Sequence, residues 1–228
     1  TRDGILRVCR DMGAHIELLN VSGGTGEPTA DILVRHGSLH GTVIGGLHTY
    51  LIDELPVIAA MACFAEGETV IRDAGELKVK ESNRIAVMVQ GLAAMGADVT
   101  ETEDGMIIRE GAPLHGAVID SRKDHRIAMT FAVTALCADG ITEIRDADCV
   151  NISYPGFYSD LKKLAQDKQK PHPLRLYSGY GCGSVFVVFS LFMVFLLPLP
   201  NPNTSYPSRR HPVSIMTTNN GQIQWLPH

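Results

Sequence analysis

Two stretches of the chain, 55–65 and 127–137, carry apolar residues at nearly every position. At this length, such patterning predicts helices that are buried on all sides. The stretch 84–95 differs, because its apolar residues recur at the i, i+4, i+7 spacing of a half-exposed helix: Ile85, Val89, Leu92 and Met95. The pattern therefore predicts two buried helices and, between them, one helix with a solvent-facing side.

Short strands and turns are expected between these helices. The segments 69–72 and 142–145 read as strands, and 98–101 pairs with 106–109 in a hairpin whose turn contains an Asp-Gly step. Glycines mark the helix ends, since glycine readily adopts the positive φ of that position: Gly67, Gly96 and Gly140. Alternating helices and strands of this kind predict an α/β module resembling a βαβαββ unit.

The body of the chain also repeats itself. The segment 65–74 recurs at 138–147, an offset of 73, and 39–44 recurs at 114–119, an offset of 75. Self-similarity in a constant order indicates that one supersecondary unit is used more than once. The alternative is that a common α/β sequence style occurs twice by chance.

Composition divides the chain of 228 residues near residue 166. Residues 1–166 hold 15 basic and 24 acidic residues, a charge of −9, whereas 167–228 hold five basic and one acidic, a charge of +4, together with eight of the 12 prolines. The tail contains a 13-residue apolar run at 185–197, short of the roughly 20 residues a membrane helix needs. A misassembled or out-of-frame end, an unusual membrane anchor and a disordered extension all remain open for 167–228, although a membrane partner is not favoured.

Composition also excludes several functional classes. A net charge of −5 gives no reason to expect nucleic acid binding. Five cysteines without CxxC spacing indicate neither a zinc site nor a disulfide framework, which favours a reducing, cytoplasmic compartment. The chain starts at Thr1 without a visible signal peptide, and we expect it to be a piece of a longer protein.

Charged clusters stand at the expected helix starts, at 53–54, 78–84 and 124–126. A helix N-terminus attracts anions, and basic side chains at that end oppose the helix dipole unless an anion offsets them. The clusters therefore predict a ligand rich in phosphate or carboxylate. Taken singly, each has a plainer interpretation: Asp53 as a helix cap, Glu81 as a first-turn acid, His125 as a hydrogen-bonded polar residue, and 78–84 as a solvated loop.

Four motifs, at 51–56, 76–84, 124–128 and 153–155, together resemble the C-terminal part of the EPSP synthase family (3-phosphoshikimate 1-carboxyvinyltransferases). The resemblance runs over 1–166. The related UDP-N-acetylglucosamine enolpyruvyl transferases are the second candidate, since they share the fold but differ at 79–84 and 124–126. The resemblance implies an inside-out α/β barrel domain built from repeated βαβαββ units, with the tail unrelated to it.

The resemblance also implies an activity: the enolpyruvyl group of phosphoenolpyruvate moves to the 5-hydroxyl of shikimate 3-phosphate in aromatic amino-acid biosynthesis. It implies no cofactor and no metal. By position, Asp53 and Glu81 match the family's catalytic carboxylates, while the substrate-binding matches are Lys80, Arg84, His125 and Arg126. Ile152 departs from a lysine that some members carry. The family's N-terminal half is missing, so the chain holds one wall of a two-sided site, and a catalytically silent lone domain is the alternative.

Overall fold

The computed structural model describes residues 4–22, 29–35, 37–46, 51–166 and 214–218. The first elements are a helix and a strand pair, after which strands and helices alternate. In chain order they are α1 (Gly4–Asp11), β1 (His15–Ser22), β2 (Thr29–Arg35), β3 (Val43–Ile44), α2 (Leu55–Ala62), β4 (Glu68–Ile71), the 3₁₀ helix η2 (Gly75–Val79), α3 (Arg84–Ala94), β5 (Asp98–Glu101), β6 (Met106–Arg109), β7 (Val118–Asp120), α4 (His125–Thr134), the 3₁₀ helix η3 (Ala135–Cys137), β8 (Ile141–Arg145), the 3₁₀ helix η4 (Ala147–Ile152), α5 (Phe157–Gln166) and β9 (Ser214–Thr218).

Three sheets are formed by these strands. One has the order β3-β4-β6-β5, with β3 parallel to β4 and the β5–β6 hairpin antiparallel beside it. A second joins β7, β8 and β9 in parallel, and β1 with β2 forms an antiparallel pair. The predicted hairpin is confirmed, with the register Asp98 opposite Arg109.

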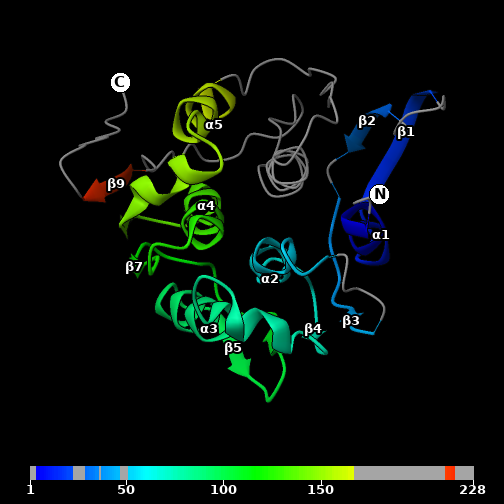
Figure 1. Ribbon diagram of the computed structural model, residues 1–228. Helices are drawn as coiled ribbons and strands as arrows, with labels where there is room; N and C mark the ends of the chain where they lie inside the picture. Colours follow the sequence, from blue (N-terminus) through cyan, green and yellow to red (C-terminus); the bar gives the residue numbers. More distant parts are fainter. Residues whose placement is uncertain (1–3, 23–28, 36, 47–50, 167–213, 219–228) are drawn as a thin grey trace, which may run out of the picture.

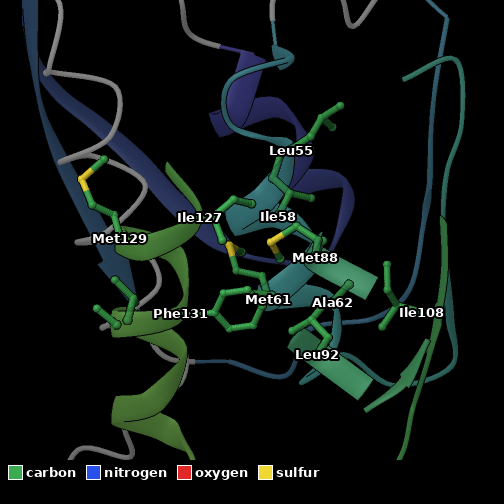
Figure 2. Packing of buried hydrophobic residues seen from close by; sticks show 14 of the residues in the cluster. Leu55, Ile58, Met61, Ala62, Met88, Leu92, Ile108, Ile127, Met129 and Phe131 are labelled. Atoms are coloured by element: carbon green, nitrogen blue, oxygen red, sulfur yellow. The ribbon is translucent and has the colours of Figure 1, made fainter. Parts of the chain in front are cut away.

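The helices α2, α3 and α4 gather in the middle of the molecule, while the strands lie around them (Figure 1). Ile58 and Met61 of α2 and Phe131 of α4 are fully buried, and the Phe131 ring reaches from α4 toward Met61 (Figure 2). Continuous apolar sequence in α2 and α4 therefore gives helices that are surrounded by protein, as the pattern predicts. In α3 only one side is buried, and Ile85 and Leu92 lie on it.

The predicted helix bounds need correction at several ends. Helix α2 ends at Ala62 rather than at residue 65, because the amides of Cys63, Phe64 and Ala65 bond to carbonyls three residues back and tighten the chain into turns. Helix α4 begins at His125, two residues early, and passes into η3 after Thr134.

Two of the three glycine predictions are wrong in the same way. Gly67 and Gly140 have φ of 83° and 94°, but each stands directly before a strand and not at a helix end. Gly96, with φ of 92°, follows the C-cap Met95 of α3, so that prediction is confirmed.

Corresponding hydrogen bonds occur in the two segments that resemble each other in sequence. The amides of Gly41 and Gly116 donate to the backbone carbonyls of Glu66 and Asp139, each over 2.7 Å. A Cβ at either glycine would collide with the backbone of the neighbouring strand. Both positions therefore require glycine, because the backbone of the neighbouring strand leaves no room for a side chain.

Strand β9 corrects one expectation for the tail. It pairs with β8 over its whole length, from Ile141 opposite Ser214 to Arg145 opposite Thr218. The interpretation of the tail as a disordered extension is therefore wrong for these five residues. The apolar run at 185–197 lies outside the described residues. Within the described ranges, no helix is both long enough and apolar enough to cross a membrane.

Candidate active site

Side chains at the starts of α3 and α4 fix where these helices begin. The Asn83 side chain accepts a hydrogen bond from the Ala86 amide over 3.2 Å, and Asp124 accepts from the Arg126 amide over 3.0 Å. Both are standard N-cap contacts. The plain interpretation of Asp53 as a cap is wrong, because Glu54 occupies the N-cap position of α2 and the Asp53 carboxylate is used elsewhere.

The Arg84 guanidinium is the centre of the site, although Arg84 is only 1% exposed. Its Nε donates to Asp124 over 2.8 Å, and its two terminal nitrogens reach Asp53 over 3.3 Å and Glu81 over 2.5 Å. A second bond from Nη2 to Asp124 spans 3.4 Å. Three carboxylates from separate segments therefore surround one cation, using four of the five donors that a guanidinium has.

Arg126 joins this cluster through Asp53. One terminal nitrogen forms an ion pair with the Asp53 carboxylate at 3.1 Å, and the other donates to the Asp53 backbone carbonyl, also at 3.1 Å. Arg126 is 14% exposed and Asp53 26%. Asp53 is thus held between two arginines, one on α3 and one on α4.

The charges within the cluster correct the prediction that the basic side chains at these helix starts need an anionic ligand to offset them. Asp53, Glu81 and Asp124 supply three negative charges to the two arginines. The protein's own carboxylates therefore offset the unfavourable dipole interaction of Arg84. An incoming anion has to compete with them.

Burial and charge shift two ionisable groups here. Burial alone raises the pKa of Asp124, but its hydrogen bonds and ion pair with Arg84, helped by the Ser82 hydroxyl and the Arg126 amide, outweigh burial and lower it. Burial lowers the pKa of His125, and the charge of Arg126 adds to this effect. His125 is therefore neutral and Asp124 ionised at neutral pH.

Two basic side chains of the predicted cluster are directed elsewhere. The Lys80 ammonium pairs with Glu76 at 2.5 Å, and Lys78 donates to the Glu103 carbonyl over 2.6 Å. The structure thus brings together Asp53, Glu81, Arg84 and Arg126, with His125 close enough to feel their charges, while no contact links Lys80 to the group. Ile152 is 78% exposed.

From the sequence, no role was assigned to two residues of the cluster, Ser82 and Asp124. Asp124 is fully buried, and the Ser82 hydroxyl donates to it over 3.0 Å. An aspartate directly before an apolar helix is a cap signal, which could have identified its place but not its contact with Arg84. Among the described residues, no group of three or more potential ligands is arranged to hold a metal ion.

Comparison with known proteins gives one consistent result. The sequence profile of the family "EPSP synthase (3-phosphoshikimate 1-carboxyvinyltransferase)" matches residues 1–161. The chain is 52% identical over 165 residues to the 3-phosphoshikimate 1-carboxyvinyltransferase of Synechococcus sp. (strain JA-3-3Ab), covering 72% of this chain and 37% of the relative. It is also 52% identical over 167 residues to that of Roseiflexus castenholzii, covering 73% and 39%.

A solved structure agrees with these relatives. EPSP synthase from Acinetobacter baumannii superposes with a TM-score of 0.66 at 39% identity, covering 70% of this chain and 38% of that one. The chain therefore spans less than two fifths of the length of these two curated relatives.

Proposed function

Because the chain belongs to the EPSP synthase family, we propose that it supplies one wall of an active site that transfers the enolpyruvyl group of phosphoenolpyruvate to the 5-hydroxyl of shikimate 3-phosphate, releasing phosphate. The observation that carries this proposal is the meeting of Asp53, Glu81 and Arg126 around the Arg84 guanidinium. In this proposal the other wall comes from the part of the longer relatives that these residues do not match.

The two carboxylates have separate tasks in this proposal. Asp53 takes the proton from the attacking 5-hydroxyl, and Glu81 delivers a proton to the methylene carbon of phosphoenolpyruvate. The hydroxyl oxygen bonds to the neighbouring carbon. In the resulting tetrahedral adduct the C–O bond to phosphate breaks, a methyl proton returns to Glu81 as the double bond is restored, and the proton held by Asp53 leaves with the phosphate. Contact of both carboxylates with one guanidinium supports this division, because it keeps them within the width of a small substrate.

The arginines bind the anionic substrate. Planar guanidinium groups suit carboxylate and phosphate, with two parallel hydrogen bonds to each. Arg126 is the more exposed of the two, so it makes the first contact, and Arg84 binds when Asp53 or Glu81 moves aside. Neutral His125 lines the site, and Lys80 turns from Glu76 toward the shikimate phosphate.

We also propose that 1–166 belongs to an inside-out α/β barrel of repeated βαβαββ units, to which 167–228 is unrelated. The order β3, α2, β4, α3, β5, β6 supports such a unit. The matched hydrogen bonds of Gly41 and Gly116 support a second copy.

Reconstitution tests the function. The chain is mixed with the N-terminal part of the Synechococcus relative that it does not match, and phosphate release is measured with both substrates. We expect turnover from the mixture and none from the chain alone, because half a site cannot orient two reactants. Turnover with UDP-N-acetylglucosamine in place of shikimate 3-phosphate would contradict the proposed acceptor, and no turnover with either acceptor would favour a silent domain.

Two variants test the assigned roles in the same mixture. Glu81→Gln keeps the shape of the side chain and should abolish turnover while leaving substrate binding largely intact; Glu101→Gln, on the exposed strand β5, is its control. Arg126→Ala should raise the KM for phosphoenolpyruvate. Full turnover by Glu81→Gln would remove Glu81 from the mechanism.

A further inference from the structure

We propose that Asp124, supported by Ser82, is a positioning residue that sets the direction in which the Arg84 guanidinium faces the substrate. This rests on the proposed function only in assigning Arg84 a substrate to bind. The three carboxylates contact different edges of the Arg84 guanidinium.

Asp124 binds the buried edge of the guanidinium, which carries Nε and one N–H of Nη2. Both the Nε and one Nη2 contact of Arg84 go to this carboxylate, which is fully buried. A ligand from solvent cannot reach this edge, so the contact persists when substrate binds.

The opposite edge, formed by the terminal nitrogens Nη1 and Nη2, contacts carboxylates that are partly exposed to solvent. Its partners are Asp53, 26% exposed, and Glu81, 50% exposed. An arriving anion can displace these side chains and take over the terminal nitrogens. Asp124 therefore acts as the fixed partner and decides where the remaining donors point.

Ser82 and the start of α4 hold Asp124 itself. Its Oδ2 accepts from the Ser82 hydroxyl over 3.0 Å, and its Oδ1 accepts from the amides of Arg126 and Ile127 over 3.0 and 3.4 Å. A carboxylate with this many donors has little freedom to rotate. One side chain thus aligns the arginine of α3 with the first turn of α4, which carries Arg126.

The decisive variant is Asp124→Asn. Asparagine is as good an N-cap as aspartate, so the start of α4 survives, but the charge is lost and an amide NH₂ can stand against the Arg84 donors. Asn83→Ala is the matched control, because it removes a helix cap one residue from Arg84 without touching the guanidinium. A merely structural role for Asp124 would make the two variants behave alike.

The first readout needs no activity. In the 228-residue chain labelled with ¹⁵N-arginine, the Arg84 Nε–H signal, assigned by its loss in Arg84→Lys, should exchange slowly with water. We expect it to shift and exchange at least 10-fold faster in Asp124→Asn, and to remain unchanged in Asn83→Ala. An unchanged signal in a folded Asp124→Asn variant would overturn the proposal.

The second readout uses the reconstituted enzyme. A guanidinium displaced by about 1 Å can cost on the order of 100-fold, so we expect that loss in kcat/KM for phosphoenolpyruvate with Asp124→Asn, mainly through KM. If the Nε–H signal responds as expected but wild-type mixtures show no turnover, the proposed function fails and the positioning role stands. If Asp124→Asn does not fold, Ser82→Ala decides: faster Nε–H exchange supports the proposal, and wild-type exchange overturns it.

Discussion

Replacing Gly91 with alanine tests how α3 packs against α4. Gly91 is buried in the middle of α3, and a Cβ there would overlap the Phe131 ring, with two ring carbons at 2.8 and 2.9 Å and Cζ closer still. Phe131 is itself fully buried, so the ring has little room to move aside. The neighbouring helices therefore approach closely because this residue has no side chain.

Two opposing effects set the magnitude. Alanine is favoured over glycine in a helix interior by about 1 kcal/mol, whereas overpacking a dense core costs about 1–3 kcal/mol. Since the three nearest atoms all belong to one buried ring, we take the upper end of that range. Gly91→Ala should then lower the free energy of unfolding by about 2 kcal/mol.

Urea unfolding followed by circular dichroism measures this difference. Gly75→Ala is the control, because a Cβ at Gly75 meets no atom within 4 Å. In a Phe131→Leu background the overlap is removed, and the same Gly91→Ala change should become neutral or stabilising by up to about 1 kcal/mol. A stabilising Gly91→Ala in the wild-type background would refute the reasoning.

Three further outcomes are expected. Thr69 and Thr142 hold buried hydroxyls without a hydrogen-bond partner in the described structure, so Thr→Val at either site should raise the free energy of unfolding by about 1 kcal/mol in the same urea assay, with Thr→Ser as the control. Because the fold lowers the pKa of His125 from 6.5, the unfolded chain binds that proton more readily. Stability should therefore be full above pH 6.5 and decrease as the pH falls through the folded-state pKa, a dependence that His125→Asn should weaken in denaturation curves. Ile152→Lys should change unfolding by less than about 0.5 kcal/mol, because the residue is exposed, and should tighten phosphoenolpyruvate binding in the reconstituted enzyme.

Local patterns predicted the elements whose contacts are short-range. The single buried side of α3 and the Asp-Gly hairpin follow from spacing and turn chemistry, and both are confirmed, although Met88 is buried on that side where Val89 was expected. The end of α2 was missed because the apolar run continues through 3₁₀-type turns, which have the same composition as the helix. Pairing of β9 with β8 depends on segments about 70 residues apart in the chain, which no local pattern could reveal.

The candidate site divides in the same way. Its residues could be selected from the sequence because they stand in motifs at helix starts. The contacts between these residues could not be predicted, because arginine is normally exposed. Arg84 is buried here because Asp53 and Asp124, from other segments of the chain, balance its charge. Lys80 shows the reverse, since a partner four residues away, Glu76, holds it outside the cluster.

The long sequence separations within the cluster have a consequence for folding kinetics. Arg84 reaches partners 31 and 40 residues away, and Arg126 bonds to a carbonyl 73 residues away. Closing such loops costs entropy before any bond is gained, so these contacts form late, after the helices have docked. We expect substitutions in the cluster to accelerate unfolding far more than they slow folding. The cluster around Arg84 is then the part of the domain whose integrity sets the lifetime of the folded state.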